Sequence, residues 1–393
     1  MSPAAAEASH VAALDGLRGL AALVVVLRHT VNAMPMPVAW RSEILAGPLA
    51  LVQNSQGAIQ LFFVLSGWVL AASLARGAPG PLGWLPFYVR RIFRIHVPFV
   101  CAGLFAFALS RIWSVPNEEA VTIWLRKSSI HPSFGALLAS FTFPGTAAGL
   151  VPIGWTLTIE MIYSFALPAI ALLARPTRGL ALLALAIAGL FTPWRIAWFG
   201  LDFALGVVAF QQRDAIARAI QVLPGAVRAA IPLLGLALLH VPYWYRLVPI
   251  GTAPGRTPRE IAVMGVGSVL LVISALALPR FARAIGSRPC RFLGRISYGV
   301  YLLHRPLLTL LAPLVLVPTL VASKLIEIHG VTLPSVVALL ALMIGGSIAL
   351  AVPFHRFVEQ PAIAAGQRLS RALERALGLR RAERREQPPA LLP

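Results

Sequence analysis

Long apolar stretches alternate with short polar or basic connections along most of the chain. A helix needs ~20 mostly apolar residues to cross a bilayer, and lipid forces such a stretch to satisfy its backbone hydrogen bonds internally. The pattern therefore predicts an all-α fold, a polytopic transmembrane helix bundle with about ten spans. The predicted spans lie near residues 11–31, 56–75, 95–113, 153–174, 179–193, 195–212, 229–245, 261–279, 298–318 and 335–355.

Two regions fit this pattern less well. In the pair at 179–212, Pro193 and Arg195 separate two segments that are both short. The stretch 134–151 is apolar but is interrupted by Gly and Pro, which is typical of a re-entrant or surface segment rather than a span.

The composition excludes a soluble protein of several domains. Hydrophobic residues make up 58% of the chain and charged residues 12%, against about half and a quarter in globular proteins. The formal net charge of +20 would suggest nucleic acid for a soluble chain. In a membrane protein it instead indicates basic cytoplasmic loops and contact with anionic lipid, so we expect membrane lipid and no nucleic acid as partners. The two cysteines, Cys101 and Cys290, show no metal-ligand spacing, and no metal site is expected.

The basic residues also predict an orientation. About 22 of them fall on one side of a ten-span bundle and about 8 on the other, which places both termini in the cytoplasm. We expect a multi-pass protein of the inner (cytoplasmic) membrane, with a transmembrane domain at 1–361 and a basic cytoplasmic tail at 362–393. The first ten residues contain no Lys or Arg, so the first apolar segment is expected to be retained.

Charged residues within spans are costly and are therefore candidates for function. The first span carries Asp15, Arg18 and His29. Arg18 and His29 are eleven positions apart, which places them on about the same helix face and ~16 Å apart along the axis. Small residues, Ala22 and Val25, lie between them, as a narrow channel would require. Interfacial anchoring of Asp15 and Arg18 and a structural role for His29 explain the spacing equally well.

A second candidate cluster opens the fourth span with Trp155 and Glu160. The predicted orientation places Glu160 a turn or two below the outer surface, at a depth similar to that of His29. A carboxylate beside an imidazole orients the ring and raises its basicity, as in general-base catalysis. We therefore predict that Glu160 orients His29.

Three arginines, Arg90, Arg91 and Arg94, mark the cytoplasmic entrance of the third span. Aromatic residues interleave with them, and this pattern is common in the interfacial belt of membrane proteins. The alternative is a site for a polyphosphate or nucleotide, because the guanidinium fork binds phosphates.

Weaker signals occur in four other spans. Ser66 lies among small and aromatic residues of the second span, and Tyr298 and His304 share a face of the ninth. Glu359 ends the tenth span at its cytoplasmic side. Asp202 stands alone in the sixth span, and we interpret it as structural.

Taken together, these segments resemble the acyltransferase-3 family of integral membrane O-acyltransferases. The matching pieces keep their order and spacing across nearly the whole chain: Leu14–Gly19 with His29, Phe62–Gly67, Arg90–Arg94, Gly154–Glu160, Ser297–His304 and Glu359–Pro361. The resemblance implies that Arg18 and His29 take part in activity and that Arg91 and Arg94 bind the acyl donor. One departure is Gln360, at a position where relatives commonly carry a basic residue.

The resemblance also implies a reaction. An acyl-CoA such as acetyl-CoA would be the co-substrate, with no permanently bound cofactor, and would dock its phosphates against Arg91 and Arg94. His29 would act as general base for a hydroxyl arriving from the outer side, by direct transfer or through an acyl-histidine. The expected acceptor is a surface or exported carbohydrate such as an exopolysaccharide, an O-antigen or a lipid-linked glycan. A small natural product such as a macrolide is the alternative acceptor, and a transporter or flippase is the alternative class.

Overall fold

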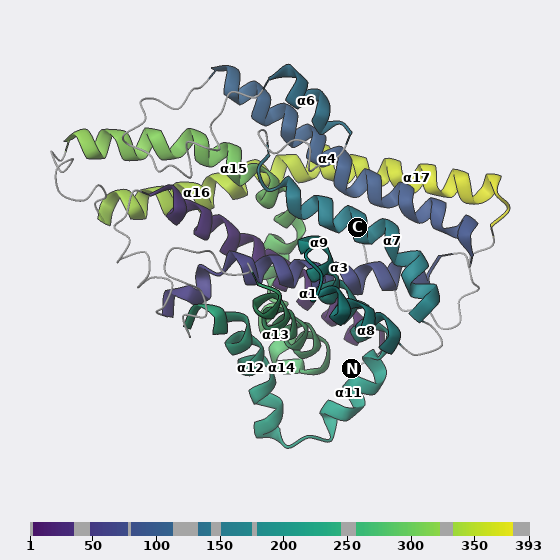
Figure 1. Cartoon of the computed structure of the whole chain (residues 1–393). Coiled ribbons are helices and arrows are strands. Elements are labelled where there is room, and N and C mark those ends of the chain that lie inside the picture. The colour runs from purple at the N-terminus through teal and green to yellow at the C-terminus, as the bar shows by residue number, and fades with distance from the viewer. Residues whose placement is uncertain are drawn as a thin grey trace.

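Every regular element in the part of the chain that the structure describes is helical (Figure 1). The structure is a computed structural model. It describes residues 3–34, 48–77, 80–112, 133–142, 151–174, 179–244, 257–322 and 333–379. The all-α prediction is confirmed for these residues.

The longest apolar helices coincide with predicted spans. Within the described ranges, six helical stretches are long and apolar enough to cross a membrane. They include α3 (Ser55–Ala75), α4 (Trp84–Ile112), α12 (Gly225–Trp244), α13 (Pro258–Ala277), α15 (Arg288–Ala322) and α16 (Leu333–Phe354). The helices α1 (Pro3–Ala33) and α7 (Gly154–Ala174) cover the first and fourth predicted spans. The count of ten and the cytoplasmic termini stay predictions.

The region predicted as a fifth and a sixth span forms shorter helices. Helix α8 (Leu180–Gly189) has 10 residues and α10 (Gly200–Gln211) has 12, whereas a crossing needs ~20. A single turn, α9 (Arg195–Trp198), separates them. Five further short helices connect the longer ones: η1 (Pro48–Val52), η2 (Pro81–Gly83), α6 (Phe134–Ser140), α11 (Arg213–Gln221) and α14 (Pro279–Ile285). Helix α6 covers the start of the apolar stretch 134–151, of which residues 143–150 lie outside the described ranges.

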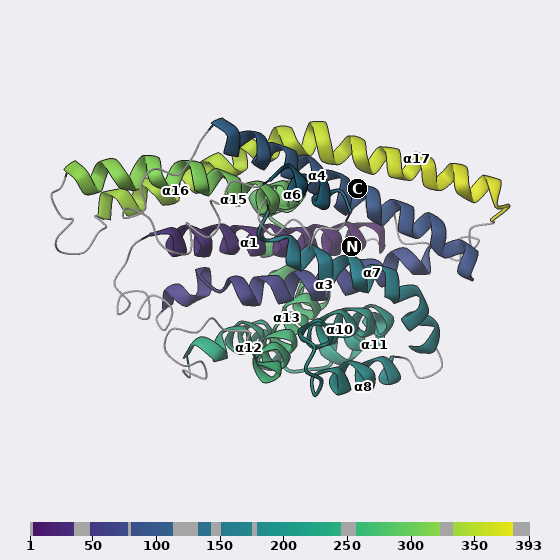
Figure 2. The same ribbon diagram turned by 45° about the horizontal axis from the view of Figure 1, so that its top comes forward.

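Helices α1 and α3 run side by side through the middle of the molecule (Figure 2). Helix α1 packs along α15, while α3 packs along α10 and α13. The contact between α1 and α15 is close, because a Cβ added at Gly19 would lie 2.5 Å from the backbone nitrogen of Gly294. Two glycines facing each other let these helices approach as small-residue pairs do in membranes. The approach fixes the two helices that carry His29 and His304.

The last helix continues far beyond the apolar segment. After α16 the chain passes through one π-helical segment, η6 (His355–Glu359), directly into α17 (Gln360–Ala376). Helix α17 lies alongside α4 in both views (Figures 1 and 2). Helix α17 covers the first part of the tail predicted at 362–393, and residues 380–393 lie outside the described ranges. The division into domains at residue 361 stays a prediction.

Candidate active site

Two histidines from different helices form one end of the site. His29 Nδ1 of α1 lies 2.8 Å from His304 Nε2 of α15. The two rings are stacked with centroids 5.0 Å apart. His29 therefore has a specific polar partner in a segment 275 residues further along the chain.

The backbone of α15 determines which nitrogens of this pair carry protons. His304 Nδ1 lies 2.7 Å from the carbonyl oxygen of Tyr301 and 3.2 Å from that of Val300. A carbonyl oxygen only accepts, so Nδ1 of His304 carries the proton, and its Nε2 in the neutral ring is the acceptor. His29 Nδ1 must then donate to it. The lone pair of His29 consequently resides on Nε2, the nitrogen that a general base uses.

Two arginines flank the histidine pair. Arg28 precedes His29 on α1, and Arg305 follows His304 on α15 with only 3% of its surface exposed. The charges of both arginines act on His29. Sequence reasoning missed them, although their position directly beside each histidine was a visible signal.

A second polar cluster joins α3, α4 and α7. Arg91 Nη2 lies 2.8 Å from Glu160 Oε1, and the Ser66 hydroxyl donates to the same oxygen at 3.0 Å. Arg91 also donates from Nε and Nη2 to the Ser164 hydroxyl, each at 3.2 Å. The ion pair is buried on the arginine side, where an unpaired cation would be strongly unfavourable.

This cluster corrects the predicted partner of Glu160. The carboxylate contacts Arg91 and Ser66, whereas the side chain that meets His29 comes from His304. The physical reason is the burial of Arg91, because a buried guanidinium requires a carboxylate and Glu160 is the one within reach. The prediction that Glu160 orients His29 is therefore wrong in this structure.

Further cations gather beside this cluster. Arg18 Nη1 is 3.0 Å from Asp15 Oδ1 on the same helix. The positive charge of Arg18 repels those of Arg91 and Arg94, and the negative charge of Asp15 attracts that of Arg94. Three positive side chains thus face one region against two carboxylates, Asp15 and Glu160. We call this region the arginine end, and the region around His29 and His304 the histidine end.

Two predicted site residues point elsewhere. Arg90 extends from α4 to α17, where it donates to Ser370 Oγ and pairs with Glu374 Oε1 at 3.2 Å. Trp155 is 38% exposed and packs on Phe199, with ring centroids 5.9 Å apart. Neither residue joins the polar clusters described above.

Two tyrosines of α15 connect the arginine and histidine ends. Tyr298 donates to the Ile95 carbonyl at 2.7 Å, and the charges of Glu160 and Arg91 act on it. Tyr301 shares a hydrogen bond of 2.7 Å with Thr156, and its ring centroid is 6.0 Å from that of His304. Tyr298 and His304 are six positions apart, a rise of ~9 Å. Tyr298 contacts α4, Tyr301 contacts α7 and His304 contacts α1, so these side chains of α15 reach three different helices.

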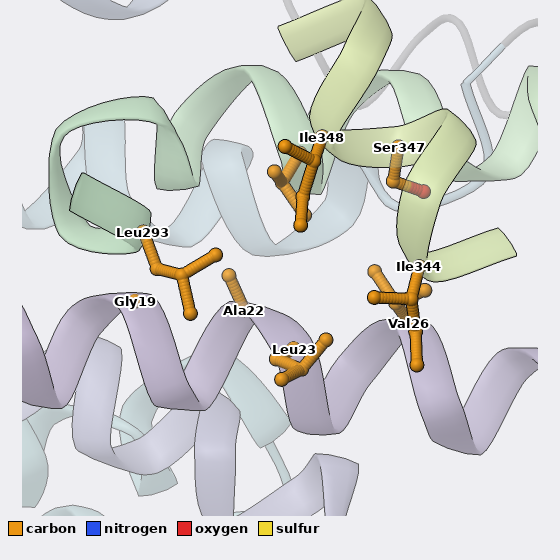
Figure 3. Close-up of a pocket in the computed structure, with 9 residues that line it drawn as sticks. Gly19, Ala22, Leu23, Val26, Leu293, Ile344, Ser347 and Ile348 are labelled. Carbon is orange, nitrogen blue, oxygen red and sulfur yellow. The ribbon is translucent and has the colours of Figure 1, made fainter. Parts of the chain in front are cut away.

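A small apolar pocket lies beside the segment of α1 that joins Arg18 to His29 (Figure 3). It opens between α1, α15 and α16, and Ala22, expected to border a channel, is one of the residues that line it. The lining residues are Gly19, Ala22, Leu23, Val26, Leu293, Val300, Ile344, Ser347 and Ile348.

Long apolar helices with buried ion pairs and a histidine pair define a multi-pass membrane protein with a polar interior. A family model described as an acyltransferase domain matches residues 11–352. The chain therefore belongs to the acyltransferase 3 family and is an acyltransferase. No curated protein and no solved structure matches it significantly.

Proposed function

We propose that the protein transfers an acyl group, in particular acetyl, from cytoplasmic acyl-CoA to a hydroxyl of a surface or exported carbohydrate. The observation that supports this proposal is that the polar side chains form two separate groups. The arginine end includes Arg18 of α1, and the histidine end includes His29 of the same helix. The arginine end suits an anionic donor, and the histidine end suits proton transfer. Tyr298 and Tyr301 of α15 lie between them.

The arginine end would bind the phosphates of the donor. Arg91 is held by Glu160 and Ser164, and Arg18 is paired with Asp15. Arg94 forms no hydrogen bond with another described side chain, while the charges of Arg18 and Arg91 act on it. We therefore assign the principal phosphate contact to Arg94, with Arg91 and Arg18 supplying the surrounding positive field.

The histidine end would carry out the transfer. His29 Nε2 takes the proton of the acceptor hydroxyl while the hydroxyl oxygen attacks the thioester carbonyl carbon. The carbon–sulfur bond breaks, and the leaving thiolate receives the proton from His29. His304 acts as a positioning residue, because its hydrogen bond holds His29 in the tautomer that the step requires.

The proposed orientation agrees with this division of roles. With about ten spans and cytoplasmic termini, the start of α4 lies at the cytoplasmic side, where acyl-CoA is made available. The carboxyl end of α1, which carries His29, then lies toward the outer side of the inner membrane, where an exported glycan is presented. The acceptor thus meets the thioester after the acyl arm has crossed part of the bilayer.

The proposal is tested with purified protein and acetyl-CoA labelled in the acetyl group. We expect release or transfer of the label by the wild type and its loss in His29→Ala. The matched control is His96→Ala, because His96 lies on α4 away from both ends and its Nε2 donates to the backbone carbonyl oxygen of Phe141 at 2.9 Å. A folded His29→Ala protein with near-normal turnover would exclude His29 as the base.

The acceptor class is tested with the same label. Acetylated glycans recovered after incubation with lipid-linked or polymeric sugar would support the carbohydrate proposal. Transfer to a macrolide with no transfer to sugar would contradict it and favour the small-molecule alternative.

A further inference from the structure

The family model matches the chain as far as residue 352, near the end of α16. The chain then continues in helical form through η6 and α17. This extension packs against α4, which carries Arg91 and Arg94 of the arginine end, and touches α15, which carries Tyr298 and His304. Two features of the extension point to a role in the site: a buried carboxylate, Glu359, and a set of contacts that hold the turn of α4 containing Arg90.

Glu359 is oriented by a short hydrogen-bonded chain. Gln360 Nε2 lies 3.1 Å from His355 Nε2, and His355 Nδ1 lies 2.9 Å from Glu359 Oε2. The amide nitrogen can only donate, so His355 accepts at Nε2 and donates from Nδ1 to the carboxylate. This chain fixes Oε2 and thereby aims Oε1. Gln360, the departure from the family pattern, is the residue that sets the tautomer of His355.

The other oxygen of Glu359 is left for a ligand. Glu359 is 5% exposed, and its Oε1 is buried without a hydrogen-bond partner among the described residues. It faces Gly299, where an added Cβ would lie 3.0 Å from it, and its charge acts on the neighbouring Tyr298. A buried carboxylate oxygen without a donor is unfavourable, so a ligand that supplies an N–H or O–H would stabilise this arrangement.

The π-helical segment η6 contains His355 and Glu359, two residues of this hydrogen-bonded chain. Segments of this kind are rare and occur frequently at functional sites. Here η6 begins at His355 and ends at Glu359, so the wide turn is bounded by the two hydrogen-bonded residues.

Helix α17 meanwhile holds the turn of α4 that carries the arginines. Arg90 binds Ser370, which is 1% exposed, and pairs with Glu374. One turn away, α17 lies so close to α4 that a Cβ at Gly366 would be 2.6 Å from Phe93 Cβ. Adjacent residues of a helix lie about 100° apart around its axis, so with Arg90 anchored to α17, Arg91 points toward α7 and pairs with Glu160.

We infer that this C-terminal extension completes the arginine end of the site. Glu359 Oε1 accepts a hydrogen bond from an N–H group of the acyl donor, and α17 positions the arginines of α4. The inference rests on the proposed function. A carboxylate would repel the phosphates, so its partner is the uncharged part of the donor. Acyl-CoA offers amide N–H groups along its pantetheine arm, between the phosphates and the thioester. Glu359 would bind this arm as it passes Tyr298.

The first experiment compares Glu359 variants on two donors, acetyl-CoA and S-ethyl thioacetate, which lacks the phosphates and both amide groups of the pantetheine arm. We expect Glu359→Ala to raise KM for acetyl-CoA about tenfold, the effect of one hydrogen bond to a charged group, with kcat nearly unchanged. Glu359→Gln keeps an acceptor oxygen and should fall between Ala and wild type. Turnover of the truncated donor should be the same in all three proteins.

The second experiment separates positioning from general stability. Arg90→Ala and Glu374→Gln should raise KM for acetyl-CoA severalfold, because the arginines of α4 lose their fixed orientation. Arg371→Ala is the matched control, since Arg371 is an exposed residue of α17 whose side chain, among the described residues, donates to the Gln367 carbonyl of its own helix. Unfolding temperature and size-exclusion profile are recorded for every variant.

The outcomes distinguish the two proposals. If the wild type does not turn over acetyl-CoA, both the proposed function and this inference are overturned. If it does, but Glu359→Ala lowers kcat equally on both donors with KM unchanged, Glu359 is not a donor contact. Arg90→Ala behaving as Arg371→Ala does would remove the positioning role of α17.

Discussion

The two ends of the site are built from different kinds of interaction. At the arginine end, α1, α3, α4 and α7 contribute charged and hydroxyl groups that are joined by ion pairs, such as that between Arg91 and Glu160. At the histidine end, α1 and α15 contribute two imidazoles joined by one hydrogen bond, and a backbone carbonyl defines their tautomers. Binding a polyanion requires positive charge, whereas taking a proton requires a neutral nitrogen in a defined direction.

This contrast predicts different kinetic consequences at the two ends. A change at the histidine end should act on the chemical step and therefore on kcat. A change at the arginine end should act on donor binding and therefore on KM, or on the stability of the buried cluster.

The largest expected effect is at His29. His29→Ala should lower kcat about 10³-fold with KM for acetyl-CoA unchanged, because general-base catalysis contributes typically 10²–10⁴-fold. If His304 acts only through His29, the double variant His29→Ala/His304→Ala should lose no more than the single one. The measurement is steady-state turnover of labelled acetyl-CoA. A further tenfold loss in the double variant would show that His304 has a role of its own.

The next effect concerns the stability of the buried ion pair. Arg91→Ala leaves Glu160 without its cation in the membrane interior and should destabilise the protein by about 3–5 kcal/mol. Arg91→Met combined with Glu160→Gln removes both charges and should recover much of that loss. Thermal unfolding in detergent measures both. Equal destabilisation by the single and the double variant would show that packing, and not charge, is the cause.

Some features of the fold and of the site could be predicted from the sequence, and others could not. Apolar length predicted the long helices, because the bilayer sets the length of a span. It identified the segments at 179–212 as short but did not predict where α8, α9 and α10 begin and end. Residue types and helix faces identified Arg91, Glu160, His29 and His304 as candidates.

The pairing of these residues could not be predicted. Helical periodicity relates positions on one helix, and the ion pair joins α4 to α7 while the histidine pair joins α1 to α15. Which helices are neighbours depends on side-chain packing, such as the close contact between Gly19 and Gly294. For this reason the prediction placed Glu160 beside His29, whereas the structure pairs it with Arg91.

A smaller effect is expected when the partner of His29 is changed. His304→Ala removes the acceptor for His29 Nδ1 and should lower kcat about 10–100-fold, the usual range for a residue that orients a functional histidine. His304→Gln supplies a carbonyl oxygen that accepts from Nδ1, so it should retain more activity. The matched comparison is the KM for acetyl-CoA, which should be the same in both. Equal kcat values for the Ala and Gln variants would contradict the assigned tautomer.

The smallest of these effects is expected at Arg94, and it tests the assignment of the donor phosphates. Arg94→Ala should raise KM for acetyl-CoA about tenfold, since a charge-assisted contact contributes roughly 1.5–3 kcal/mol and neighbouring arginines remain. Arg94→Lys keeps the charge but loses the fork, so its KM should lie between the two. The wild-type KM should also rise with salt, and the rise should be shallower in Arg94→Ala. An unchanged KM in Arg94→Ala, with kcat reduced instead, would place Arg94 at the chemical step. It would contradict the assignment of donor binding to the arginine end and of chemistry to the histidine end.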